Sequence, residues 1–337
     1  MGRLMPRQPT SDSSEMCPGP VLGPLKAAVA GSCRFGLPIL VGGALLAGCS
    51  VRKLAVGGLA SALGESAQVF SSDDDPELVR DALPFALKTI EVLLAESPEN
   101  VELLRTACST FTQYAVGFLL FEAEEIQDEE YRRAQELEER SLRMLLRARD
   151  YGLRALDVRH PGIAQELPMD PEAAAARLEE EDVAVGYWTA AAWGKAILLG
   201  LDRPDVAADL DAVRALIERG LELDEDFDRG ALHEAMISFE AIEQIGGSPE
   251  KARMHFERAV ELSGGQRASP YVTFAESFAV GTQDRAEFEM LLGKALAIDL
   301  DEDPTARLNN RIQQSRAQGL LDRVDDLFLG SEDGPFE

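Results

Sequence analysis

The sequence predicts an all-α protein, and three observations support that prediction. Alanine and leucine are abundant, whereas aromatic residues make up only 6% of the chain, a balance that favours helix over sheet. No stretch alternates apolar and polar residues convincingly with the period of two that a strand requires. Clusters of proline, glycine and aspartate separate segments whose apolar residues recur at helical spacing.

Composition also excludes several classes of protein. The 337 residues include 33 Lys plus Arg and 60 Asp plus Glu, a net charge of -27. So acidic a surface repels phosphates, which argues against nucleic-acid binding. Three His and four Cys are too few for a disulfide-stapled miniprotein or a protein with several zinc clusters. The length predicts one or two domains with a large core.

The N-terminal region has the features of an export signal. Arg34 precedes the uncharged segment 35–48, FGLPILVGGALLAG, which is shorter than the roughly 20 residues of a membrane-spanning helix. Its end, Leu46-Ala47-Gly48-Cys49, resembles the lipobox of bacterial lipoproteins, which makes Cys49 the expected lipidation site and mature N-terminus. A plain signal anchor is the alternative. The long segment before Arg34 also leaves open a later translation start at Met16.

These features predict a domain organisation. Residues 1–48 are the signal peptide, 49–72 a lipidated tether, 73–330 a helical-repeat domain and 331–337 a tail. Cleavage removes four basic and two acidic residues, so the mature charge becomes -29 and Cys108 is the sole cysteine besides Cys49. We expect the protein in the periplasm, attached to a membrane by its lipid only. Ser50 after Cys49 favours sorting to the outer membrane.

The helices are predicted from their boundaries. Asp73-Asp74-Asp75-Pro76 begins the first, because aspartate caps first-turn amides and proline suits the first helical position. That helix ends at Glu96, and Ser97-Pro98-Glu99-Asn100 begins a second that reaches residue 126. A third covers 129–158, and an irregular linker with at most short helices follows. Further helices are predicted over 180–199, 204–222, 229–245, 249–263, 271–280, 284–298 and 304–329.

A weak internal repeat relates several helix ends. The segments are DYGLRALDV (150–158), LIERGLELD (216–224), HFERAVELS (255–263) and LLGKALAID (291–299). The later spacings, 39 and 36, are close to the 34 residues of a tetratricopeptide repeat. Small residues at their centres would let neighbouring helices approach closely: Ala155, Gly220, Ala259 and Ala295. We therefore predict an irregular tetratricopeptide-like helical-repeat solenoid.

Several segments resemble the T component (TatT) of TRAP transporters, a family of tetratricopeptide-like lipoproteins. The clearest is 72–100, SDDDPELVRDALPFALKTIEVLLAESPEN. Others are Gln113-Tyr114-Ala115, Tyr187-Trp188, Ala192-Trp193-Gly194, Gly246-Gly247 followed by 251–256, the Asn309/Asn310 helix and 325–328. The resemblance covers nearly all of the mature chain. It implies a periplasmic, lipid-anchored homotrimer that associates with the substrate-binding P component. It also implies a pore or cleft that passes a hydrophobic ligand or organic acid.

The residues themselves offer little sign of catalysis. His160, His233 and His255 are scattered outside any known catalytic motif, and Cys108 fits a small buried apolar residue. The alternating aspartates from Asp224 and from Asp299 lack the glycine and twelfth-position glutamate of a calcium loop. We expect no enzyme activity, no metal site and no cofactor.

Aromatic residues supply the candidate ligand site. Tyr187, Trp188 and Trp193 lie on one predicted helix beside small residues. Trp188 and Trp193 are about 140° apart around it, so one face cannot hold both. Either the rings pack between helices, or one ring lines an apolar cleft with Lys195 near its mouth. Tyr114 and Phe118 are secondary candidates.

Two functions fit these predictions. The first is an accessory component of a TRAP-type transport system that binds the P component and possibly a hydrophobic or organic-acid ligand. The second is a lipoprotein scaffold for cell-envelope assembly without a small ligand, since helical repeats bind protein partners routinely.

Overall fold

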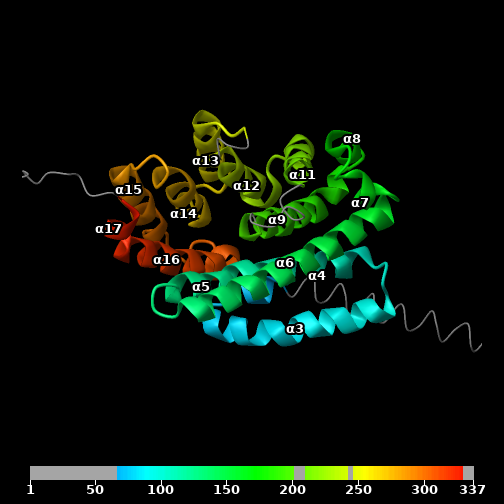
Figure 1. The fold of residues 1–337 in the computed structure, drawn as a ribbon, viewed down its shortest axis with the longest axis horizontal. Helices are drawn as coiled ribbons and strands as arrows, with labels where there is room; N and C mark the ends of the chain where they lie inside the picture. Colours follow the sequence, from blue (N-terminus) through cyan, green and yellow to red (C-terminus); the bar gives the residue numbers. More distant parts are fainter. Residues whose placement is uncertain (1–66, 201–208, 242–245, 329–337) are drawn as a thin grey trace, which may run out of the picture. The chain divides into compact units, whose positions relative to one another are not determined.

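The computed structural model describes residues 67–200, 209–241 and 246–328, and every regular element in these ranges is helical (Figure 1). The predicted all-α class is confirmed for this part of the chain. Outside the described residues lie the predicted signal peptide, Cys49, most of the tether and the tail. Parts of the helices predicted over 204–222, 229–245 and 304–329 also lie there.

The first half contains the two longest helices of the described chain, α3 and α6. In chain order its elements are α2 (Ala67–Ser71), α3 (Pro76–Glu96), α4 (Val101–Tyr114), the π-helix η1 (Ala115–Leu120), α5 (Phe121–Ile126), α6 (Tyr131–Arg159), α7 (Ile163–Glu166), α8 (Pro171–Ala175) and the 3₁₀ turn η2 (Glu180–Asp182).

The second half continues the series with shorter helices. Its elements are α9 (Val183–Leu199), α11 (Leu210–Leu223), the turn η3 (Phe227–Arg229), α12 (Ala231–Glu240), α13 (Pro249–Leu262), α14 (Ser269–Phe274), the π-helix η5 (Ala275–Ala279), α15 (Arg285–Leu296), the turn η6 (Pro304–Ala306), α16 (Arg307–Asp322) and α17 (Val324–Leu327).

The predicted capping residues begin the helices as expected. The Asp75 carboxylate accepts a hydrogen bond of 3.0 Å from the Leu78 amide, with Pro76 at the first position of α3. Asn100 accepts one of 3.0 Å from the Leu103 amide at the start of α4. Each cap satisfies a first-turn N–H that has no partner within its own helix.

The structure adds detail to two predictions about the N-terminal elements. Residues 67–71, assigned to the tether, form the helix α2, which contacts α16 and η6. A segment this short carries no amphipathic period that sequence reasoning could detect. The predicted helix up to residue 126 is interrupted by the π-helix η1, a widened turn of the kind that occurs often at functional sites.

Neighbouring helices pack mainly in chain order, and the last long helix returns to the first elements. Successive contacts connect α3, α4, α6, α9, α11, α12, α13, α14, α15 and α16. In turn, α16 contacts both α2 and α3, and Arg316 on α16 forms an ion pair of 2.9 Å with Glu124 on α5. The irregular tetratricopeptide-like solenoid remains a prediction, and α16 turns back instead of extending the stack.

The small residues of the repeat lie where helices approach closely. Ala155, Ala259 and Ala295 are fully buried. A Cβ added at Gly220 would lie 2.9 Å from the Leu232 side chain. Gly230, which has a φ of 95°, would place a Cβ only 3.1 Å from the Ala259 Cα. The repeat therefore marks helix contacts, as predicted.

The tightest crossing in the core joins α4, α6 and α9. Gly152 of α6 lies against Cys108 of α4 and Thr189 of α9, and all three are buried. The Thr189 hydroxyl donates a hydrogen bond of 2.6 Å to the Val185 carbonyl. Burial raises the pKa of the Cys108 thiol to about 12. Cys108 is therefore a protonated, buried side chain, in agreement with the apolar role predicted for it.

Candidate functional site

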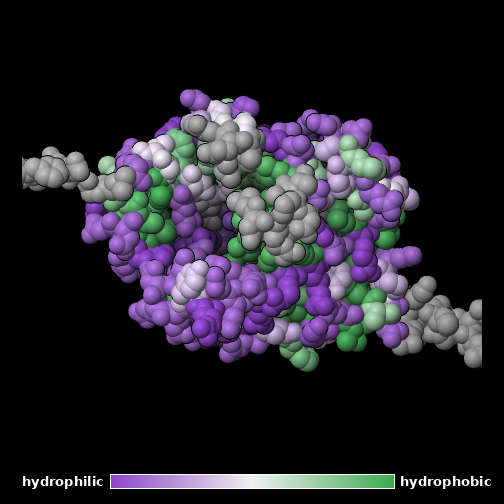
Figure 2. All heavy atoms as spheres, in the orientation of Figure 1, coloured by the Kyte–Doolittle hydropathy of each residue, from purple (hydrophilic) through white to green (hydrophobic). Residues whose placement is uncertain are grey.

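A cavity of about 720 Å³ lies among the helices, within the range of about 300–1,000 Å³ that is typical of small-molecule sites. Its lining residues come from α2, α3, α4, η1, α9, α11, η3, α12, α14, η6 and α16, and from Arg267 just before α14. Figure 2 shows that hydrophilic residues cover much of one face of the molecule, which is hollowed near its middle. The cavity thus depends on elements from both ends of the described chain.

Most of the cavity wall is apolar. Val79, Leu83 and Ile90 come from α3, and Ile312 comes from α16. Ala190, Ala191 and Gly194 of α9 leave room beside the rings. The larger lining side chains are Phe70, Val116, Phe118, Trp188, Leu198, Leu210, Ile217, Phe239 and Leu308. Such a wall favours binding of the apolar part of a ligand, because the apolar surfaces of the wall and of the ligand are both removed from water.

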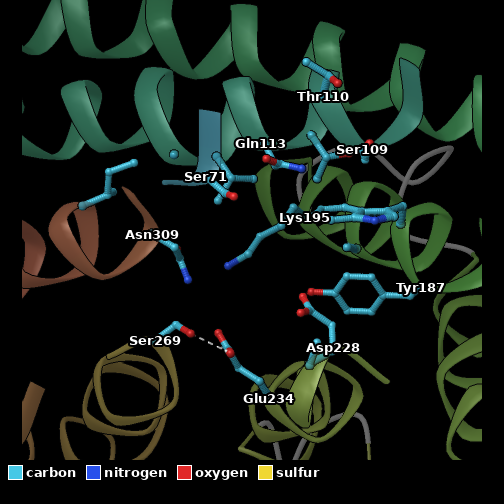
Figure 3. Close-up of a pocket in the computed structure, with 18 of the residues that line it drawn as sticks. Ser71, Ser109, Thr110, Gln113, Tyr187, Lys195, Asp228, Glu234, Ser269 and Asn309 are labelled. Carbon is cyan, nitrogen blue, oxygen red and sulfur yellow. Dashed lines mark hydrogen bonds between the residues drawn. The ribbon is translucent and has the colours of Figure 1, made fainter. Parts of the chain in front are cut away.

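Polar groups converge on the open part of the cavity (Figure 3). The Lys195 side chain and the Asn309 amide reach inward from α9 and α16, and Glu234 and Ser269 face them from the other side. The Ser269 hydroxyl donates a hydrogen bond of 2.7 Å to Glu234 Oε2. A mostly apolar wall with a few convergent polar groups is the usual character of a ligand site.

Lys195 has no direct partner among the described residues. It makes no hydrogen bond or ion pair with any described residue. Burial lowers the pKa of its ammonium below the ordinary value, and the charge of Arg316 lowers it further. Glu276, Glu124 and Glu234 act in the opposite direction. The ammonium can therefore donate hydrogen bonds to a ligand that supplies negative charge.

Glu234 is the carboxyl group on the opposite side. Burial raises its pKa above the ordinary value, although the hydrogen bond from Ser269 lowers it. Arg267 and Lys195 also lower it, whereas Asp228 raises it. Burial likewise raises the pKa of the Tyr187 phenol, and the negative charges of Glu234 and Asp228 raise it further. The polar side of the cavity is thus a partly desolvated carboxyl cluster.

Asp228 is held in the cavity wall by an unusual backbone. Asp228, Arg229 and Gly230 have φ values of 42°, 56° and 95°, the left-handed region that favours glycine. For the two non-glycine residues, such a conformation costs on the order of 1–3 kcal/mol each. Arg267 Nη2 donates a hydrogen bond of 2.6 Å to Asp228 Oδ1, and Arg229 pairs with Asp303. These contacts fix the turn.

The structure separates the aromatic and lysine candidates into two groups. Tyr187, Trp188, Lys195 and Phe118 line the cavity, with the Tyr187 and Trp188 rings 5.0 Å apart. Trp193 is only 1% exposed and lies in the core under the Arg149 guanidinium. Tyr114 is buried under Arg140 and is not among the cavity-lining residues. Ligand binding by the first four stays a prediction.

Sequence reasoning missed several polar residues of the cavity. Glu234, Arg267 and Asn309 were not considered as site residues, and Asp228 was considered only as part of a calcium loop. These four residues span more than 80 positions of the chain, and the packing of α12 and α16 against α14 brings them together. Within the described ranges, no group of three or more His, Cys, Asp and Glu could hold a metal ion.

The histidines lie outside the cavity lining and have hydrogen-bonding partners. His233 and His255 approach within 2.8 Å through their Nδ1 atoms, and His233 Nε2 is 3.2 Å from Glu225 Oε1. His160 Nε2 is 2.7 Å from Asp182 Oδ2.

Comparisons with known proteins show the family of this chain. The family model of the TRAP transporter T-component matches residues 72–328. An uncharacterized protein of Treponema pallidum (strain Nichols) is 28% identical over 308 residues, which cover 85% of this chain and 94% of that protein. Among the described helices, none has both the length and the apolar character needed to cross a membrane. Because the family match covers most of the sequence, the chain belongs to the TRAP transporter T-component family.

Proposed function

We propose that the protein is the periplasmic, lipid-anchored accessory component of a TRAP-type transport system. In this proposal Cys49 attaches it to the membrane, a surface of the helical domain binds the substrate-binding P component, and the cavity holds a hydrophobic or organic-acid ligand. Family membership implies association with a TRAP transport system and an envelope location. The observation that supports ligand binding best is the mostly apolar cavity into which Lys195 extends.

Helix α3 offers a candidate surface for the P component. Leu78, Phe85 and Val92 are 59%, 79% and 65% exposed, and their seven-residue spacing puts them on one side of the helix. Large apolar side chains gathered on an exposed surface are a common mark of a protein contact. We call Leu78, Phe85 and Val92 the α3 stripe and assign the P component as its partner.

The contact can be tested by placing a charge in the middle of the stripe. We expect Phe85→Glu to abolish or strongly reduce co-purification of the P component, because a carboxylate would be desolvated where an apolar ring was buried. Met169→Glu is the matched control, since Met169 is 76% exposed and lies between α7 and α8. It should retain the partner at the wild-type level.

Photo-crosslinking in cells gives an independent measurement. A benzoylphenylalanine at position 85 should form an adduct with the P component, whereas the same group at position 169 should not. Crosslinks between copies of this chain would assign the α3 stripe to the homotrimer instead. Absence of any P-component adduct from several surface positions would favour the scaffold function and contradict the transport role.

A further inference from the structure

We propose that the cavity binds the anionic head of an amphiphilic ligand at Lys195, and that Glu234 takes up one proton from solvent as the ligand binds. This inference rests on the ligand-binding role proposed above and adds the charge of the ligand and the linkage to pH.

The first argument is the pairing of the cations in the cavity wall. Its described lining residues include three cationic side chains. Arg105 donates a hydrogen bond of 2.8 Å to Glu102, and Arg267 donates one of 2.6 Å to Asp228. Lys195 alone has no hydrogen bond or ion pair within the described part of the chain, and its ammonium extends into the open part of the cavity. A buried ammonium without a carboxylate contact is a ready site for an anion.

The second argument is the charge of the groups around Lys195 and Glu234. Arg316 contacts Glu124 and Glu276 at 2.9 and 3.0 Å, and these three residues influence Lys195 from α16, α5 and η5. Asp228 and Arg267 influence Glu234 from the turn η3 and the segment before α14, and Tyr187 faces the same carboxyl cluster from α9. Three cations therefore accompany four carboxylates: Lys195, Arg267 and Arg316 against Glu234, Asp228, Glu124 and Glu276. An additional anion is unfavourable here unless one carboxylate is neutralised.

The third argument is the proton balance of Lys195 and Glu234. Without ligand, Lys195 and Glu234 are either an ammonium and a carboxylate or a neutral amine and a neutral acid. Both forms hold the same number of protons. An anionic ligand favours the ammonium and the neutral acid together, a state with one more proton than either alternative. We assign the ammonium and the carboxylate as the ligand-free state, from which the added proton goes to Glu234; from the neutral pair it would go to Lys195 instead.

Glu234 is the carboxyl group best placed to accept this proton. It lines the cavity, and its described hydrogen-bonding partner is the neutral Ser269 hydroxyl. Asp228 contacts the Arg267 guanidinium at 2.6 Å. Burial also raises the pKa of Glu124, but Glu124 contacts the Arg316 guanidinium at 2.9 Å and does not line the cavity. Burial raises the pKa of Glu234 above its ordinary value, so neutralising it costs less than neutralising an exposed carboxylate.

The experiment compares two ligands that differ only in the head group. Binding of dodecanoate and dodecanol to the full mature protein is measured by calorimetry between pH 6 and pH 8.5, where the dodecanoate carboxyl stays ionised. We expect dodecanoate affinity to rise as the pH falls, by up to about tenfold for each pH unit. This is the dependence expected when binding takes up one proton. Dodecanol affinity should stay constant.

The variants assign the two roles. Lys195→Met should weaken dodecanoate binding by at least about tenfold and leave dodecanol binding unchanged, since only the charged head loses its donor. Glu234→Gln should remove the pH dependence of dodecanoate binding. Glu124→Gln is the matched control and should retain the pH dependence. Unchanged thermal unfolding of each variant shows that the fold is intact.

Four other results would contradict part or all of this inference. Dodecanoate binding that does not vary with pH in the wild type, or that survives Lys195→Met unchanged, would overturn this inference while leaving the cavity as a ligand site. Loss of the pH dependence in Glu124→Gln alone would overturn the assignment to Glu234. If neither dodecanoate nor dodecanol binds, the proposed ligand-binding role fails as well.

Discussion

Gly152→Ala is expected to destabilise the protein more than an ordinary surface change. The new Cβ would lie 2.1 Å from Thr189 Oγ1 and 3.0 Å from Cys108 Sγ, both inside normal contact distance. Thr189 cannot turn away freely, because its side chain is branched at Cβ and its hydroxyl donates to Val185. Overpacking of a core costs about 1–3 kcal/mol, and the shortness of this contact places the expected loss at the upper end. Urea denaturation measures it.

Gly293→Ala is the matched control for this prediction. Gly293 also lies within a helix, α15, but an added Cβ would meet nothing within 4 Å. Replacing a helical glycine by alanine in open space stabilises a helix by roughly 0.5–1 kcal/mol. The two substitutions should therefore change the free energy of unfolding in opposite directions. Equal effects would show that the α4, α6 and α9 crossing is looser than described.

Asp182→Ala is expected to have the second large effect. Asp182 is completely buried, forms an ion pair with Arg159 and accepts a hydrogen bond of 2.9 Å from the Glu179 amide. His160 Nε2 lies 2.7 Å from Asp182 Oδ2, the same oxygen that accepts the hydrogen bond from the Glu179 amide. The substitution leaves the Glu179 amide and the His160 ring without their acceptor, which costs about 1–3 kcal/mol for each unsatisfied buried group, whereas Arg159 keeps its pair with Glu181. Chemical denaturation at pH 7 measures the loss.

Glu181→Ala is the control for Asp182→Ala. Glu181 pairs with the same arginine at 2.9 Å, but its side chain is 78% exposed. Exposed ion pairs contribute only about 0–1 kcal/mol, so this substitution should be nearly neutral. A loss as large as that of Asp182→Ala would contradict the importance of burial at this site.

The same carboxylate makes stability depend on pH. Burial alone would raise the pKa of Asp182, but hydrogen bonds from Glu179 and His160 and the charge of Arg159 lower it overall. A group whose pKa is lower in the folded state stabilises the fold above its unfolded pKa, about 3.9 for aspartate. This contribution should disappear as the pH falls through the lower folded value. Asp182→Asn should lack this part of the acid sensitivity.

Local signals in the sequence were sufficient to predict the helices. Asp75 with Pro76, and Asn100, cap their helices as their chemistry requires. Gly220 and Ala259 predicted close helix contacts because a larger side chain would not fit there. These features depend on residues a few positions apart or on side-chain size, and both can be seen in the chain itself.

The cavity could be predicted only in part, because its residues converge from distant segments. The 140° between Trp188 and Trp193 indicated that one ring at most could face a cleft, but not which one. Packing decides: Trp193 lies beneath Arg149 in the core, and Trp188 lines the cavity. Glu234 gives no local signal, since a glutamate on an amphipathic helix usually faces solvent. The contribution of α2 depends on a contact with α16 about 240 residues away.

The central claim, that the cavity binds an amphiphilic ligand, can be tested with the two tryptophans of the chain. In Trp193→Phe the remaining Trp188 lines the cavity, whereas in Trp188→Phe the remaining Trp193 lies in the core. Fluorescence of each variant is recorded during a titration with dodecanoate at pH 6.5. We predict a saturable change in Trp188 emission and none in Trp193 emission. Equal responses from both tryptophans, or none from Trp188, would contradict the claim.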